Sequence, residues 1–280
     1  MIRIPIFIKN GIKINYVEQG EGEPLVLVQG YCCKLESWNY QISFFSKKMK
    51  VIALDLRGLG KSSRTDDSYT IHTFVEDIKD LLEYLNIKER IHLCGFSNGG
   101  TIVESFVLKY PNLVKTLMLF GTAADIPDEE YEQQLKLLDQ NFKEYTPEQL
   151  IDITLPIMFS TSFRRKLRKD EKLFELYKND MGLVAHLRDP PRYQDYVNHW
   201  KAIKNFDVRK LLPSITQPTL ILVGSKDQGN LMASKDMHEK IKNSTMEVLE
   251  GIGHGLIIEA PEKTNELMWN FIKGHLDQKT

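Results

Sequence analysis

Gly95-Phe96-Ser97-Asn98-Gly99 is the stretch of sequence that decides the fold. An apolar run over 91–94 precedes it and a helical pattern over 98–110 follows it, so the serine lies at a predicted strand-to-helix turn. The sharp turn forces unfavourable backbone angles on the serine, and side chains at 95 and 99 would collide, so glycine is needed at both positions. The backbone N–H of Asn98 then lies at the helix N-terminus, where it can bind a developing oxyanion. The stretch predicts an exposed, nucleophilic serine.

Strand patterns recur on both sides of this turn. Continuous apolar runs are typical of parallel strands covered on both faces, and the two alternating segments at the N-terminus are typical of edge strands. Strands alternate with helices, which predicts an α/β fold, a mostly parallel eight-stranded sheet with helices on both faces. The predicted strands are 2–9, 12–18, 25–28, 51–54, 91–94, 114–120, 218–223 and 246–249, and the helices between them are 37–48, 70–85, 98–110, 231–241 and 261–276.

The alternation of strand and helix patterns stops between the sixth and seventh predicted strands. From about 125 to 205 the pattern is helical and charged, with one break at Asp189-Pro190-Pro191, where proline cannot continue a helix. We interpret this stretch as a helical cap inserted into the core. The expected division is a core made of 1–122 and 206–280, with the cap over 123–205.

Composition excludes several classes of function. The chain has 280 residues, 42% of them hydrophobic, and a formal net charge of −1, which suits one large α/β core with an insertion. The sequence has no basic stripe of the kind that would predict nucleic-acid binding. It also has no apolar run that approaches the length of a membrane span. The three cysteines have neither disulfide nor metal-site spacing, so no metal is expected. We expect a cytoplasmic monomer or homodimer with a small-molecule substrate.

One basic cluster stands out against this balance. Residues 164–169 read Arg-Arg-Lys-Leu-Arg-Lys and fall inside the predicted cap. Charge runs of this kind are usually the solvated face of a helix. The alternative is a rim that attracts anionic substrates.

A serine hydroxyl needs a base to take its proton, and the base needs an acid to orient it. In a parallel sheet these groups come from loops at the carboxyl ends of strands. His254, flanked by Gly253 and Gly255, follows the last strand and is the predicted base. Asp227 follows the strand at 218–223 and is the predicted acid, with Asp125, after the strand at 114–120, as the alternative.

The second oxyanion donor should come from the loop after the strand at 25–28. That loop reads Gln29-Gly30-Tyr31-Cys32, and Gly30 permits a tight turn that aims the N–H of Tyr31 into the site, with Cys32 as the next candidate. A rival hypothesis makes Cys32 or Cys33 the nucleophile, but neither lies on a strand-to-helix turn. Lining or burial is the commoner role of such cysteines.

An apolar stretch of the cap offers candidate substrate contacts. Its side chains either fill the cap's own core or line an acyl pocket, and a cap over an apolar cleft can do both. A cap would also exclude water and favour substrates of modest size. The candidate contacts in the cap are Leu155, Met158, Phe159 and Trp200, and Cys32 of the loop after the strand at 25–28 is a further candidate.

Five ordered motifs resemble those of the α/β-hydrolase superfamily, specifically the small cytoplasmic serine hydrolases with a helical cap. The resemblance covers the core and is specific for the fold, but not for a substrate. It rests on Tyr16 to Val28, the turn from Asp55 to Ser62, the stretch around Ser97, the strand before Asp227, and Gly253-His254 followed by Glu259-Ala260-Pro261. The turn at 55–62 looks faintly like a phosphate loop but lacks its glycine spacing, so we expect a structural role.

The resemblance implies a cofactor-independent hydrolase that cleaves a small ester or lactone through an acyl-enzyme. Ser97 would attack, His254 would move the proton, Asp227 would orient the imidazole, and the N–H groups of Tyr31 and Asn98 would form the oxyanion hole. Relatives that open epoxides or displace halide carry aspartate at the nucleophile position, which Ser97 does not match. Carbon–carbon bond hydrolysis, acyl transfer, perhydrolysis and a receptor that keeps the triad remain alternatives. The family usually has histidine where this chain has Gln29, which bears on how the oxyanion loop is held.

Overall fold

The computed structural model describes residues 5–277, so residues 2–4 of the first predicted strand lie outside the described range. Eight strands form one sheet in the order β1-β2-β4-β3-β5-β6-β7-β8. The first two pairings, β1 with β2 and β2 with β4, are antiparallel, and all the others are parallel. The strands are β1 (Ile6–Lys9), β2 (Ile12–Gln19), β3 (Pro24–Val28), β4 (Lys50–Leu54), β5 (Ile91–Phe96), β6 (Val114–Phe120), β7 (Thr219–Gly224) and β8 (Ser244–Leu249).

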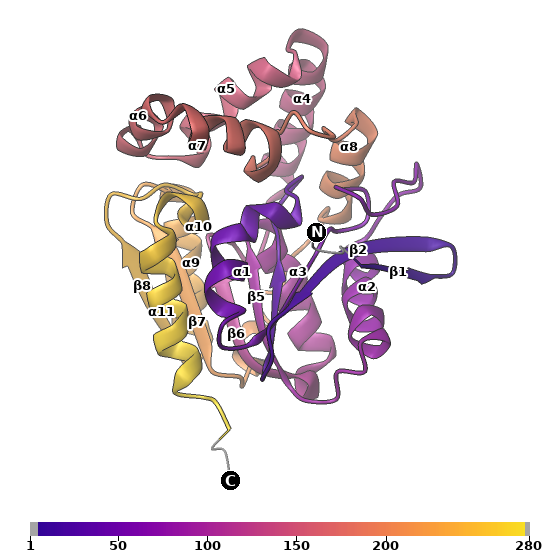
Figure 1. The fold of residues 1–280 in the computed structure, drawn as a ribbon, viewed down its shortest axis with the longest axis vertical. Helices are drawn as coiled ribbons and strands as arrows, with labels where there is room; N and C mark the ends of the chain where they lie inside the picture. Colours follow the sequence, from indigo (N-terminus) through magenta and orange to yellow (C-terminus); the bar gives the residue numbers. More distant parts are fainter. Residues whose placement is uncertain (1–4, 278–280) are drawn as a thin grey trace.

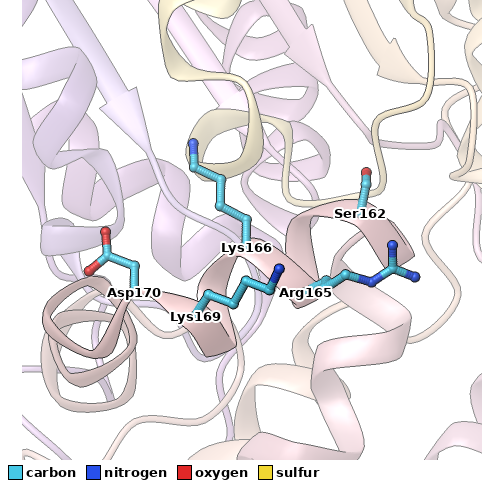
Figure 2. A pocket seen from close by; sticks show the side chains of 5 residues that line it. All are labelled: Ser162, Arg165, Lys166, Lys169 and Asp170. Carbon is cyan, nitrogen blue, oxygen red and sulfur yellow. The ribbon is translucent and has the colours of Figure 1, made fainter.

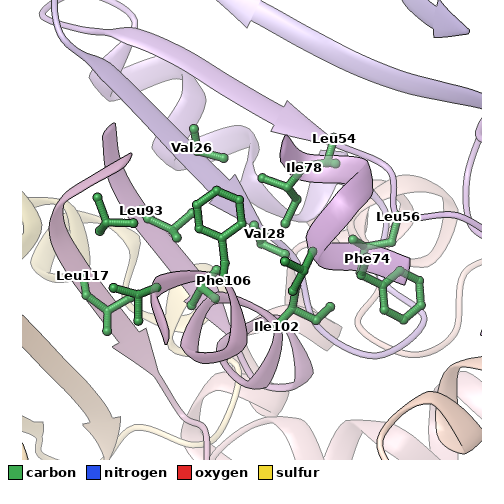
Figure 3. Packing of buried hydrophobic residues seen from close by; sticks show 14 of the residues in the cluster. Val26, Val28, Leu54, Leu56, Phe74, Ile78, Leu93, Ile102, Phe106 and Leu117 are labelled. Atoms are coloured by element: carbon green, nitrogen blue, oxygen red, sulfur yellow. The ribbon is translucent and has the colours of Figure 1, made fainter. Parts of the chain in front are cut away.

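Helices cover both faces of the sheet because strand side chains alternate between them. In β3, Val26 and Val28 belong to the cluster that holds α2 (Ile71–Tyr84), α3 (Asn98–Lys109) and α9 (Gln228–Lys240) (Figure 3). Leu25 and Leu27 belong to the cluster on the opposite face, with α1 (Asn39–Phe45), α10 (Leu256–Glu259) and α11 (Pro261–Lys273). The predicted α/β sandwich is confirmed.

The segment between β6 and β7 is helical. It holds α4 (Asp128–Glu144), α5 (Pro147–Met158), α6 (Thr161–Lys169), α7 (Glu171–Leu176), the π-helix η3 (Tyr177–Met181) and α8 (Tyr193–Ala202), all within the predicted cap. Figure 1 shows these helices gathered beyond one end of the sheet. We call α4 to α8 the cap helices. Their buried side chains merge with both core clusters, so they pack on the core rather than extend from it.

The turn after β4 has the structural role predicted for it. The Asp55 carboxylate accepts hydrogen bonds from the N–H groups of Leu35 (2.9 Å) and Lys61 (3.0 Å) and from the Asn15 amide (2.6 Å). Gly60 has φ +49°, and a Cβ there would lie 2.3 Å from Asp55 Oδ2, so only glycine fits. The turn therefore ties β2, β4 and the loop after β3 together.

Several boundaries differ from the predicted ones. The helix expected over 37–48 is the 3₁₀ helix η1 (Leu35–Trp38) followed by α1, and α9 begins at Gln228 instead of 231. Two more short 3₁₀ helices, η2 (Pro111–Leu113) and η4 (Leu212–Ser214), lead into β6 and toward β7. None of the helices within residues 5–277 is both long enough and apolar enough to cross a lipid bilayer.

Candidate active site

Ser97 lies at the predicted turn between β5 and α3, in a strained conformation. Its backbone angles are φ +54° and ψ −126°. Non-glycine residues rarely adopt such angles, and the residues that do are concentrated at functional sites. The close packing predicted for the flanking glycines is confirmed, because a Cβ on Gly95 would lie 2.3 Å from the Gly99 carbonyl oxygen. A Cβ on Gly99 would lie 2.3 Å from the Val28 carbonyl oxygen. The turn presents Ser97 at the carboxyl end of β5.

The loop after β3 lies directly against this serine. A Cβ on Gly30 would approach the Ser97 Cβ to 2.9 Å, so the loop backbone passes beside the hydroxyl-bearing carbon. The backbone N–H of Tyr31 donates to no acceptor within residues 5–277. Asn98 is the first residue of α3, where backbone N–H groups have no partner within the helix. Tyr31 and Asn98 thus follow Gly30 and Ser97, the two residues that meet here, and the role of their N–H groups as an oxyanion hole stays a prediction.

His254 and Asp227 meet although they come from different loops. The His254 Nδ1–H donates to Asp227 Oδ2 at 2.6 Å, and a carboxylate can only accept, which fixes the proton on Nδ1. The His254 ring packs on Phe96, the neighbour of Ser97, with ring centroids 4.9 Å apart. No hydrogen bond joins the Ser97 hydroxyl to His254 in the described part of the chain, and such bonds commonly tighten only when substrate binds.

The alternative acid lies elsewhere. Asp125 pairs with Arg209 at 3.1 Å and forms an isolated β-bridge with Asp207. Among the carboxylates that the structure describes, Asp227 is the one within hydrogen-bond distance of the His254 ring. The geometry therefore favours Asp227 over Asp125 as the partner of the imidazole.

The cap holds the histidine loop in a way that the sequence did not reveal. The N–H of Gly255 donates to the Met158 carbonyl at 2.7 Å. The Glu259 carboxylate accepts from the N–H of Gly253 (3.0 Å) and the N–H of Ser160 (3.1 Å), and it also contacts the Ser160 hydroxyl. We call Glu259, Ser160 and Gly253 the carboxylate clamp. It joins the cap helices to the loop that carries His254.

The candidate substrate contacts lie in different surroundings. Leu155, Met158 and Phe159 are buried in the same cluster as Phe96. Cys32 is buried in the cluster on the other face of the sheet. Trp200 stacks on Tyr131 with ring centroids 5.9 Å apart and contacts the Tyr31 ring edge-on. Their role in binding a substrate stays a prediction.

Burial makes the cysteines poor nucleophiles and two cap histidines poor bases. It raises the pKa of Cys32 and raises that of Cys33 to about 12, so both thiols keep their protons. Burial also lowers the pKa of His186 to about 3 and of His199 to about 4, so both rings are neutral. Among the side chains that the structure describes, no three His, Cys, Asp or Glu form a group that could hold a metal ion.

The basic cluster forms the exposed face of α6. Phe163 and Leu167 are buried, while most of the basic side chains point to solvent. Figure 2 shows the shallow hollow that they border, about 390 Å³ in volume, and its lining includes none of the predicted catalytic residues. The lining residues are Ser162, Arg165, Lys166, Lys169 and Asp170.

Comparison with known proteins agrees with this architecture. The family model for the alpha/beta hydrolase fold matches residues 23–261. A 3-oxoadipate enol-lactonase of Acinetobacter baylyi is 29% identical over 84% of this chain and 83% of its own. An (E)-2-((N-methylformamido)methylene)succinate hydrolase of the same species is 28% identical over 96% of this chain and 97% of its own.

Solved structures show the same fold. An esterase from Exiguobacterium antarcticum superposes with a TM-score of 0.79 at 26% identity, covering 94% of this chain and 97% of its own. The match of the family model spans most of the chain and all of the strands from β3 to β8. The chain belongs to the α/β-hydrolase family.

Proposed function

We propose that this protein is a serine hydrolase that cleaves a small, partly apolar carboxylic ester or lactone through an acyl-enzyme. The observation that carries the proposal is the convergence of three loops. A strained Ser97 lies beside Phe96, and Phe96 packs on the His254 ring, whose Nδ1–H donates to Asp227 at 2.6 Å. That arrangement leaves His254 Nε2 as the free base of the imidazole.

The chemistry follows from these positions. Ser97 Oγ attacks the carbonyl carbon while His254 Nε2 takes its proton, and the carbonyl oxygen becomes an oxyanion held by the N–H groups of Tyr31 and Asn98. The tetrahedral intermediate collapses, and the leaving alcohol receives the proton from His254. Water, deprotonated by the same nitrogen, then attacks the acyl-enzyme and releases the acid and free Ser97.

The relatives and the surroundings support an ester or lactone of modest size. One relative is named an enol-lactonase and one structural neighbour an esterase. The side chains of Phe159 and Leu183 in the cap lie next to Gly255, the neighbour of His254, which supports an apolar substrate group near the base. An apolar acyl group would exclude water from the site, which strengthens the interaction of the oxyanion with its hydrogen-bond donors.

The test is a panel of p-nitrophenyl esters of increasing acyl length and a lactone, assayed with the parent enzyme and Ser97→Ala. We expect kcat/KM to fall about 10³-fold or more in the variant, because loss of one triad member typically has that effect. Equal hydrolysis by both proteins would refute the proposal. A vinylogous diketone in the same panel separates carbon–carbon bond hydrolysis from ester cleavage, since both use the same residues.

A further inference from the structure

Asn230 lies beside the Asp227–His254 pair without belonging to the expected triad. It stands in the first turn of α9, three residues after Asp227. Its Nδ2 is 3.0 Å from Asp227 Oδ1, 3.0 Å from Asp227 Oδ2 and 3.3 Å from His254 Nδ1. One amide group therefore contacts both oxygens of the acid and the ring nitrogen that bonds to it.

The chemistry of these neighbours settles which end of the amide faces them. Both carboxylate oxygens of Asp227 accept hydrogen bonds, so the amide oxygen of Asn230 would repel them and the NH₂ group must face them. The Asp227 carboxylate uses Oδ2 to accept from His254. The 3.3 Å approach of Asn230 to His254 Nδ1 is then a contact between two donors and not a hydrogen bond.

Asn230 is the one side chain other than His254 that donates to the Asp227 carboxylate within residues 5–277. A donor at this place has two consequences. It fixes the carboxylate in a rotamer that meets the ring, and it takes up part of the negative charge that would otherwise stabilise a protonated imidazole.

The other groups around His254 leave this role to Asn230. From α10, Glu259 faces the loop, but its carboxylate is occupied by Gly253 and Ser160. The end of α5 and the segment after it meet the loop through the Met158 carbonyl and the Phe159 ring, neither of which titrates, and β6 is followed by Gly121. Phe96 covers one face of the ring. Asp125, the alternative acid, is paired with Arg209 and forms no hydrogen bond with the His254 ring.

We propose that Asn230 is a positioning residue that holds the Asp227 carboxylate against His254 and keeps the imidazole in its neutral, basic form over a wider pH range. This inference rests on the proposed function and adds to it a residue that sets the pH range of activity. Asn230 touches the acid and not the substrate, so it acts through the pair.

The experiment compares Asn230→Leu, which removes the donor at similar volume, with Asn230→Asp, which replaces it with a second acid. Gln228→Ala is the matched control, because Gln228 is an exposed amide in the same turn that donates to the Ser225 carbonyl. The readouts are the pH profile of kcat/KM for a p-nitrophenyl ester and the titration of the His254 ring followed by ¹⁵N NMR.

We expect the midpoint of the acidic limb to rise by about 0.5 to 1 pH unit in Asn230→Leu, and further in Asn230→Asp. The NMR midpoint of His254 should move with it, and kcat should fall about tenfold in Asn230→Leu. Gln228→Ala should match the parent in both measurements. If Asn230→Leu does not fold, Asn230→Ala takes its place, because it also removes the donor without adding a charge.

The failure of this proposal is distinct from the failure of the proposed function. If both midpoints stay at the parent value in both variants, Asn230 has at most a structural role, even if activity falls. If the NMR midpoint moves but no ester or lactone is cleaved in a Ser97-dependent way, the positioning role stands and the proposed function is wrong.

Discussion

Removal of the carboxylate clamp should loosen the cap and the catalytic histidine together. Glu259→Ala removes the acceptor for two backbone N–H groups, those of Gly253 and Ser160, and a contact to the Ser160 hydroxyl. An unsatisfied, buried N–H group costs about 1–3 kcal/mol. Because water can reach part of the half-buried Glu259 site, we expect a total loss of about 2–4 kcal/mol in the free energy of unfolding.

Glu259→Gln is the matched variant. Both N–H groups donate to the same oxygen, Oε2, so a glutamine can place its amide oxygen there and direct its NH₂ group to the Ser160 hydroxyl. We expect Glu259→Gln to keep most of the stability and activity that Glu259→Ala loses. This difference separates the loss of the clamp from the loss of a negative charge.

Two assays report the effect. Thermal unfolding should show a decrease in Tm of about 5–10 °C for Glu259→Ala, from the usual relation between stability and Tm for chains of this size. Steady-state ester hydrolysis should show kcat lowered about 10-fold to 100-fold, because a displacement of about 1 Å at a catalytic group has such an effect. A Glu259→Ala enzyme with the Tm and kcat of the parent would refute the coupling between cap and histidine loop.

Four further substitutions, in three experiments, test the site and the core around it. Gly121→Ala should lower kcat/KM at least tenfold in the ester assay, because φ is +52° and a Cβ would lie 3.2 Å from His254 Nδ1; parent-like activity would contradict the packing. Asp227→Asn should abolish most ester hydrolysis while Asp125→Asn keeps it, and the reverse result would exchange their roles. Burial raises the pKa of the Glu104 carboxyl well above 4.5, so the native state keeps a proton that the unfolded chain loses. The free energy of unfolding therefore falls as pH rises. In urea unfolding, Glu104→Gln should therefore be more stable than the parent at pH 8, with the gain shrinking toward pH 4; a gain independent of pH would exclude this cause.

The site residues that a sequence can reveal are those whose position follows from local rules. Ser97 is fixed by two glycines in its own turn, and His254 and Asp227 follow directly after strands of a parallel sheet. Strand ends meet at one edge, so their convergence could be inferred without coordinates. The sequence favoured Asp227 as the acid but left Asp125 as an alternative, because both follow strands and only the packing places Asp125 on Arg209.

Contacts between segments that lie far apart in the chain could not be predicted from the sequence. Ser160 and Glu259 are 99 residues apart, and they meet only because the cap packs on the core. A sequence pattern has no period that relates such positions. The position of Asn230 beside the acid was not predicted for a different reason. Gly229 and Asn230 are weak helix formers, so the sequence pattern placed the start of α9 three residues too late.

The central claim is that Ser97 is the activated nucleophile, and covalent labelling tests it most directly. A fluorophosphonate probe would be reacted with the parent, Ser97→Ala and His254→Ala proteins, and the labelled peptide identified by mass spectrometry. We predict one adduct, on Ser97, absent from Ser97→Ala and formed at least 100-fold more slowly in His254→Ala. Labelling at another residue, or at Ser97 with a rate that does not depend on His254, would contradict the account.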